Sequence, residues 1–275
     1  MMSSEFSCRE MFEEECEQES MVDREVLKSP TRNREFCQWY SIPGHDERFF
    51  VSESVEGSDF SPQGVASFRA LISILDDRFF LAALHRKPID QDDVHFIGVN
   101  KRMRYVPFAA DFGPPNLAAT MMFCEEVQRF LVEEPSKKLV FYTSPKPEDL
   151  TNSIFLCGAF MVVVLRVSPA EALKPFANVP RDVCLNYRDA TWDPVSFELS
   201  LTSCWAGLER AIQRGVFKPA SFDPEEYLHY DNHGNGNLNH VVEGKFVAFK
   251  SPREKRAKNS DGTLSHTPAD YINVL

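Results

Sequence analysis

The sequence has no apolar run long enough to cross a membrane. Its longest, Ile154 to Leu165, is well short of the roughly 20 residues that a membrane-spanning helix needs, so it predicts a buried core helix. The first residues are acidic and contain neither the basic nor the apolar region of a signal peptide. We therefore expect an intracellular protein without a membrane partner.

Paired cysteines and an excess of basic residues are also missing. The 7 cysteines are odd in number and scattered without a Cys-x-x-Cys pair, which argues against both a disulfide framework and a zinc site. The formal net charge of -11 excludes the broad basic face that general nucleic-acid binding requires, and it suits basic partners. We expect no cofactor, no metal and no nucleic-acid partner.

The residues that are present favour an α/β fold. Hydrophobic residues make up 43% and aromatic residues 12% of the 275 residues, which is enough for a packed core. Segments with the period of a strand alternate with segments with the period of a helix, and this predicts a central sheet flanked by helices. Strands are expected over Phe79–Leu84, Val94–Val99, Tyr105–Phe108, Leu139–Tyr142 and Val241–Phe249, and helices over Phe68–Leu75, Leu117–Leu131, Ile154–Leu165, Ser168–Leu173, Phe197–Ile212 and Asp223–Asp231.

Composition divides the chain into three regions. Residues 1–64 include the acidic run Glu13–Glu19 and no apolar period, so they are expected to be disordered or loosely ordered. Residues 65–249 carry the alternating strands and helices and form the predicted folded domain. Residues 250–275 are polar and begin with the basic run Lys250–Lys258, which suits a solvated linker and a nuclear localisation signal equally well.

The segment from Leu139 to Leu165 predicts a strand, a polar loop from Thr143 to Asn152 and a buried helix. Cysteine-dependent phosphatases use this layout, with His-Cys-x-x-Gly-x-x-Arg between strand and helix to attack and hold phosphate. Here the cysteine position falls near Tyr142. The loop contains prolines, which lack the N–H donor, and acids, which repel phosphate. The sequence therefore predicts the strand, loop and helix of a phosphate-binding site, but without the residues that attack and hold phosphate.

Two further patterns favour structure over chemistry. Cys204 to Arg210 matches Cys-x-x-Gly-x-x-Arg, but it lies in a predicted helix, where the backbone N–H groups already bond a turn earlier. His229 and His233 are four residues apart, as metal ligands on a helix would be. The glycines that follow at once place His233 beyond the predicted helix end, so we expect neither a catalytic cysteine nor a metal site.

Several separate blocks of residues resemble the motifs of one family, in the same order. The blocks are Asp111–Leu117, Tyr142–Ser144, Arg188–Ala190, Ser221–Tyr227, and Gly236–Asn239 with Gly244–Phe249. Together they resemble the N-terminal domain of the cell-division-cycle-14 family of dual-specificity protein phosphatases, from about Leu71 to Phe249. Ser265–Tyr271 is similar to the family's entry into its second, catalytic domain.

The resemblance implies the first of two phosphatase-like domains, one that lacks catalytic residues. Its expected partners are the catalytic domain and phosphorylated proteins with Ser-Pro or Thr-Pro sites followed by a basic residue, in cell-cycle control at mitotic exit. Expected locations are the nucleus, the cytoplasm and the spindle or centrosome. A stand-alone pseudophosphatase that acts as a protein-binding module is the alternative.

The resemblance also assigns two sets of site residues and no catalytic or metal-binding residue. The degenerate phosphate loop comprises Tyr142, Thr143, Ser144, Lys146 and Glu148. The candidates for a substrate groove are Asp231 and Glu226. In the family, acids on this helix face the basic residue of the substrate. Asp231 keeps one such acid, whereas Leu228 stands where the family has another.

Overall fold

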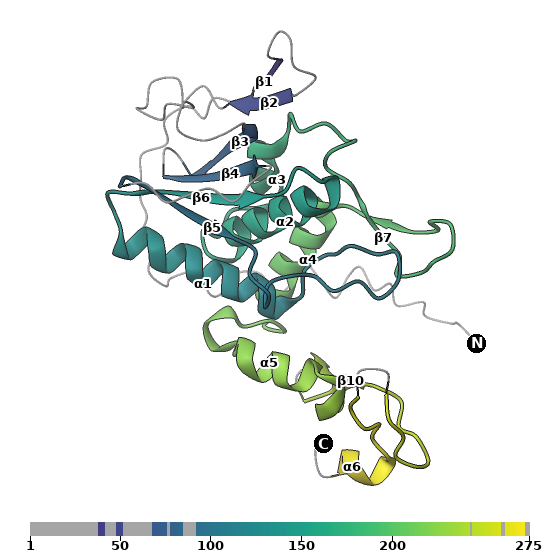
Figure 1. The fold of residues 1–275 in the computed structure, drawn as a ribbon. Helices are drawn as coiled ribbons and strands as arrows, with labels where there is room; N and C mark the ends of the chain where they lie inside the picture. Colours follow the sequence, from purple (N-terminus) through teal and green to yellow (C-terminus); the bar gives the residue numbers. More distant parts are fainter. Residues whose placement is uncertain are drawn as a thin grey trace, which may run out of the picture. The chain divides into compact units, whose positions relative to one another are not determined.

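The central structure is a four-stranded mixed sheet. The computed structural model describes residues 38–41, 48–51, 68–75, 78–84, 92–242, 244–259 and 262–272 (Figure 1). The sheet has the order β3-β4-β6-β5. Strand β3 (Phe68–Leu75) runs antiparallel to β4 (Phe79–Leu84). Strand β6 (Lys138–Thr143) lies parallel to β4 on one side and to β5 (Val94–Gly98) on the other.

The remaining elements lie outside this sheet. The helices are α1 (Leu117–Glu133), α2 (Pro147–Val163), α3 (Pro169–Leu173), α4 (Leu201–Gln213), α5 (Pro224–Asp231) and α6 (Pro268–Ile272), with 3-10 turns η4 (Lys174–Phe176), η5 (Pro219–Ser221) and η6 (His233–Asn235). The remaining strands form antiparallel pairs, β1 (Gln38–Ser41) with β2 (Arg48–Val51), β7 (Tyr187–Arg188) with β8 (Glu198–Leu199), and β9 (Leu238–Val242) with β10 (Phe246–Phe249).

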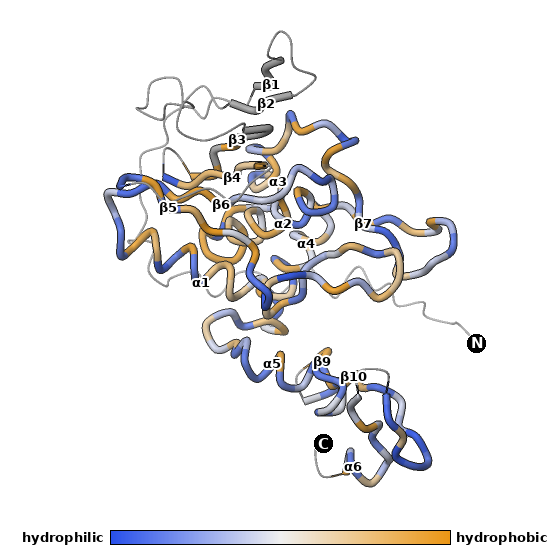
Figure 2. The backbone as a smooth tube through the Cα atoms, in the orientation of Figure 1, coloured by the Kyte–Doolittle hydropathy of each residue, from blue (hydrophilic) through white to orange (hydrophobic). Residues whose placement is uncertain are grey.

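Helix α2 is the centre of the core. It contacts α1, α3 and α4 as well as strands β4 and β6, and every residue from Ile154 to Val163 is buried. Alternate residues of β4 serve the two faces of the sheet. Phe79 and Leu81 join the helices in the main apolar cluster, while Phe80 belongs to a second cluster on the opposite face. Figure 2 shows this apolar centre in orange and α5 mainly in blue.

Most predicted elements are confirmed, including their caps. The buried helix predicted over Ile154–Leu165 is α2, and the strands predicted over Phe79–Leu84 and Leu139–Tyr142 are β4 and β6. Asn116 accepts a hydrogen bond from Ala119 N–H at the start of α1. The fold class is therefore the predicted one, a sheet flanked by helices.

The segment Phe68–Leu75 was wrongly predicted as a helix and is strand β3. Its apolar residues are spaced as in a helix, but the segment is short and pairs along its length with β4. Because short apolar runs satisfy both periods, the available hydrogen-bonding partner decides between them. The predicted boundary near residue 64 stays a prediction, since residues 1–37 and 52–67 lie outside the described part of the chain.

Four other predicted elements need correction. Tyr105–Phe108 is not a strand, because the backbone N–H of Phe108 bonds to Asp111. The single strand predicted at Val241–Phe249 is the hairpin β9–β10, turning at Gly244 with φ +69. The loop predicted from Thr143 to Asn152 ends early, because Pro147 begins α2. The helix predicted from Phe197 begins at Leu201, after the capping Ser200.

The C-terminal segment is tied to the hairpin β9–β10 by Tyr271. Its single hydroxyl proton is shared between the carbonyl oxygens of Gly236 and Lys250, which lie 2.7 Å and 2.8 Å from the hydroxyl oxygen, and its ring packs on Phe249. Residues 250–258, predicted as a linker, are thus held at their first residue and bridge back through Lys258 to Leu264. Across the described ranges, no helix is both long and apolar enough to span a membrane.

Candidate functional site

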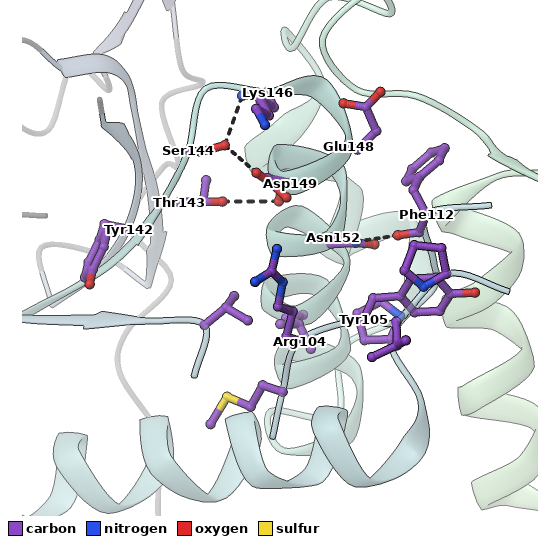
Figure 3. Close-up of a pocket in the computed structure, with 16 residues that line it drawn as sticks. Arg104, Tyr105, Phe112, Tyr142, Thr143, Ser144, Lys146, Glu148, Asp149 and Asn152 are labelled. Atoms are coloured by element: carbon purple, nitrogen blue, oxygen red, sulfur yellow. Dashed lines mark hydrogen bonds between the residues drawn. The ribbon is translucent and has the colours of Figure 1, made fainter. Parts of the chain in front are cut away.

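A pocket of about 810 Å3 lies at the predicted phosphate loop, where β6 passes into α2. All five residues of the predicted degenerate loop line it, together with residues from the segment after β5 and from α2 (Figure 3). The carboxyl ends of the parallel strands β5 and β6 meet at this edge of the sheet. Ligand sites form at this edge in open α/β sheets, so the fold places the pocket where a site is expected.

Polar groups of the loop form hydrogen bonds with one another and with the first turn of α2. Thr143 Oγ1–H donates to the carbonyl of Asp149 (3.2 Å), and Ser144 Oγ–H donates to the Asp149 carboxylate. The backbone N–H of Lys146 donates to Ser144 Oγ (3.3 Å). A phosphate cradle needs backbone N–H groups that are free to bind the ligand, whereas here an acid of the chain itself lies at the N-terminus of α2.

The phosphatase pattern can be placed on this loop by counting. If Tyr142 stands at the cysteine position, the glycine position falls on Pro145 and the arginine position on Glu148. Proline removes a backbone donor, and Glu148 puts a negative charge where a phosphate would need the guanidinium fork. The first turn of α2 carries Glu148 and Asp149, which complement the helix dipole in place of an anion.

Tyr142 is positioned by a glycine on the neighbouring strand. Gly98 pairs with Tyr142 in the register of β5 with β6. A Cβ atom on Gly98 would lie 2.6 Å from Tyr142 Cζ, closer than real contacts allow. The absence of a side chain at Gly98 therefore lets the tyrosine ring lie across the strand and form this wall of the pocket.

The opposite wall is held by Asn152 of α2. Its Nδ2 donates to the carbonyl of Phe112 (2.6 Å), and its Oδ1 accepts from the hydroxyl of Tyr187 (3.0 Å). A Cβ atom on Gly113 would lie 2.3 Å from Asn152 Oδ1 and 2.4 Å from the Tyr187 ring. These residues fix the segment after β5 against α2 and β7.

Asp111 fixes the rest of that segment. It is buried, with 4% exposure, and accepts hydrogen bonds from the Tyr105 hydroxyl and the backbone N–H groups of Phe108 (3.0 Å) and Ala109 (2.6 Å). Burial favours the neutral acid, but these hydrogen bonds outweigh it and hold the pKa of Asp111 below its usual value. Burial and Asp111 together raise the pKa of Tyr105.

The predicted site residues leave out several lining residues: Arg104 and Tyr105 after β5, and Asp149 and Asn152, which the sequence had placed in the predicted loop without a role. Arg104 extends toward the Thr143–Asp149 side of the pocket in Figure 3. The end of the predicted strand β5 was the feature of the sequence that could have identified Arg104 and Tyr105. Because β5 and β6 are parallel, the residues after each strand converge, and the basic residues after β5 could have been assigned to the same site.

The two predicted groove residues lie apart from this pocket, on α5. Glu226 is exposed in the first turn, which Asp223 caps through Glu225 N–H and Glu226 N–H. Asp231 ends the helix, is half-buried and accepts from Asn239 Nδ2 (3.4 Å). Five residues on a helix turn through about 140°, so Glu226 and Asp231 do not share a face. Neither lines the pocket, and their role stays a prediction.

The structure also places the two patterns that we set aside. Cys204 lies within α4, and burial raises its pKa to about 11, so it is held as a thiol and not as a nucleophilic thiolate. His229 is in α5, whereas His233 lies beyond the helix end in η6. In the described part of the chain, no three His, Cys, Asp or Glu side chains gather as metal ligands would.

Residues 73–211, which contain strands β4, β5 and β6, the pocket and helices α1 to α3, match the family described as "Dual specificity protein phosphatase, N-terminal half". The chain is 34% identical over 200 residues to mouse "Dual specificity protein phosphatase CDC14A" and 33% identical to its human counterpart. It is 29% identical over 188 residues to "Tyrosine-protein phosphatase CDC14" of Candida albicans. The chain belongs to the CDC14 family of dual-specificity protein phosphatases and corresponds to its N-terminal part.

The similarity covers most of this chain but a minor part of its relatives. The aligned region is 72% of this chain and 33% of the mouse protein, and 68% of this chain and 34% of the Candida protein. The chain thus spans about a third of the length of these relatives. The phosphatase names describe proteins that are much longer.

Proposed function

We propose that this chain is a non-catalytic, substrate-recognising domain of a dual-specificity phosphatase that acts in cell-cycle control. The observation that carries the proposal is the loop from Tyr142 to Glu148. It keeps the strand-to-helix position of a phosphate cradle but has tyrosine and glutamate at the cysteine and arginine positions. Without a thiolate there is no nucleophile for phosphorus, and without the guanidinium the phosphate oxygens lose their bidentate partner. Such a domain serves its enzyme by binding.

The chain alone is expected not to hydrolyse an aryl phosphate such as 4-nitrophenyl phosphate. Its cysteines in the described region are buried or half-buried, and burial raises the pKa of Cys204 to about 11. Release of nitrophenolate is the measurement. The Cys204→Ser variant is the control, because turnover that this change abolishes would contradict the proposal.

Substrate choice is proposed to rest on phospho-Ser-Pro sites that are followed by a basic residue. Asp231 is the candidate reader. Its carboxylate lies at the C-terminal end of α5, where the helix dipole disfavours an acid. Burial, with a contribution from Asp231, raises the pKa of Tyr227 to about 12. Because the position of Asp231 is unfavourable for a carboxylate, we infer that this carboxylate serves binding. A lysine or arginine of the substrate would be a suitable partner.

The test fuses this chain to a catalytic domain of the family. We compare kcat/KM for phosphopeptides with lysine or alanine three residues after the phosphoserine. Asp231→Asn should reduce the preference for lysine by up to about fivefold, since an exposed ion pair contributes up to about 1 kcal/mol. Glu226→Gln tests the other groove candidate on the same helix. We expect it to change the preference less than Asp231→Asn, because Glu226 is in the first turn, where an acid complements the helix dipole.

Leu228→Glu should strengthen the preference for lysine, because Leu228 is three residues from Asp231 and shares its face. An unchanged preference in Asp231→Asn would remove this residue from the proposal. If the fused enzyme has no preference for lysine while the isolated chain still binds protein partners, the alternative of a stand-alone pseudophosphatase is favoured.

A further inference from the structure

Four Ser-Pro or Thr-Pro pairs occur in the part of the chain that the structure describes, and one of them differs from the others. The pairs begin at Ser144, Ser168, Ser251 and Thr267. Three of them precede a helix directly or by a few residues, namely α2, α3 and α6. The pair at Ser251 precedes no helix, since residues 250–257 carry no regular element.

The three helix-linked hydroxyls are all engaged. Ser144 Oγ–H donates to the Asp149 carboxylate, and Ser168 Oγ accepts from the backbone N–H of Glu171 (3.3 Å) in a capping box. Thr267 Oγ1–H donates to Asp270 (2.8 Å), whose carboxylate also accepts from the Thr267 backbone N–H. Each hydroxyl thus takes part in local helix structure.

Ser251 has none of these constraints. Ser251, Pro252 and Arg253 are all exposed, and no described residue forms a hydrogen bond with the Ser251 hydroxyl. A residue before proline is restricted to extended backbone, which is the form in which a kinase binds its substrate. The segment is held on both sides, by the Tyr271 bond to the Lys250 carbonyl and by the bond from Arg253 N–H to the His266 carbonyl (2.8 Å).

We propose that Ser251 is a phosphorylation site for a proline-directed serine/threonine kinase. The bond between Ser251 Oγ and the γ-phosphorus of ATP forms as the bond from that phosphorus to the β,γ-bridging oxygen breaks. ADP leaves, and the hydroxyl proton passes to the catalytic carboxylate of the kinase. Phosphorylation of Ser251 does not depend on the function proposed above, because it requires only an accessible hydroxyl on the chain.

The charge around Ser251 determines what a phosphate would do there. The run Lys250–Lys258 contains five cationic side chains and one acid. A phosphoserine carries a charge of about -1.5 to -2 at pH 7, so it removes a large part of the run's positive charge. Arg253 and Lys250 lie beside Ser251 in the sequence and can form charge-assisted hydrogen bonds with it. Modification would thus weaken the attraction of this run for acidic partners without opening the segment.

The experiment treats the full chain with a cyclin-dependent kinase and Mg²⁺–ATP and maps each site over time by tandem mass spectrometry. Ser251 should be modified at least about tenfold faster than Thr267, because Thr267 must first lose two hydrogen bonds of about 1 kcal/mol each. Two unfolded peptides, one around each site, serve as controls. The difference between the sites should shrink or disappear in the peptides, since only the folded chain protects Thr267.

Two results would overturn the proposal. One is a folded chain in which Ser251 stays unmodified under conditions that modify its peptide. The other is a rate at Thr267 that equals or exceeds the rate at Ser251 in the folded chain. The Ser251→Ala variant confirms the assignment, since it should remove this modification while sites elsewhere in the chain react as before.

Discussion

Replacing Trp205 by alanine is expected to cost about 3–5 kcal/mol of the free energy of unfolding, as for other large buried aromatic residues. Trp205 of α4 is fully buried against α2 and the turn at Phe176. Its indole N–H donates to the carbonyl of Phe155 in α2 (3.0 Å). The substitution therefore opens a cavity and removes a buried hydrogen bond at once. Urea unfolding followed by far-UV circular dichroism measures the loss.

Trp192 is the matched control, because it is 80% exposed. Trp192→Ala should change the free energy of unfolding by less than about 0.5 kcal/mol, as is usual for surface positions. Equal losses in the two variants would contradict the packing described here.

Gly158 provides an independent check on the same contact. A Cβ atom at Gly158 would lie 2.1 Å from Trp205 Cζ2, so Gly158→Ala should cost about 1–3 kcal/mol through overpacking. In the Trp205→Ala background the obstacle is gone, and the same change should cost much less. A double-mutant cycle measures this coupling, and additive effects would exclude it.

Replacing Asp111 by alanine is expected to cost roughly 1–3 kcal/mol, because it removes the acceptor of the Tyr105 hydroxyl and of two backbone N–H groups. Tyr105→Phe is the matched control, since it removes one of these donors and leaves the others paired. The alanine variant should therefore lose more stability than the phenylalanine variant. A reversed order in urea unfolding would show that Asp111 does not hold the segment.

The contribution of Asp111 to the free energy of unfolding should decrease as the pH falls. The pKa of Asp111 is lower in the folded chain than in the unfolded chain, so the unfolded state binds the proton first. The stabilisation is complete above the unfolded pKa and is lost as pH falls through the folded pKa. Asp111→Asn cannot titrate, so the difference in stability between wild type and this variant should shrink in that acid range. A difference that is constant with pH would contradict this view.

The sequence was most informative where local chemistry decides the structure. Capping at Asn116 and Ser168 and proline in the first turn at Pro169 and Pro224 all follow from adjacent residues, and the structure has them. Strand β3 was missed because its identity depends on pairing with β4. The spacing of apolar residues in Phe68–Leu75 does not indicate that the segment pairs with β4.

The sequence predicts the strand–loop–helix at the candidate site, but it does not predict which other residues line the pocket. The strand–loop–helix around Tyr142 can be recognised from apolar runs, and its lack of phosphatase chemistry follows from Pro145 and Glu148. Arg104 and Asn152 reach the same pocket through the fold, because parallel pairing of β5 with β6 brings their segments together. Such convergence depends on strand order, which a single sequence does not record.

The contact of Gly113 with Asn152 and Tyr187 has an evolutionary consequence. Any side chain at residue 113 would collide with both partners, and a shorter residue at 152 would leave the Phe112 carbonyl and the Tyr187 hydroxyl without their present partner. Lineages that change one of these residues must therefore change the others at nearly the same time. Among related chains, the three positions should vary together or not at all, even though 39 residues separate the first from the second.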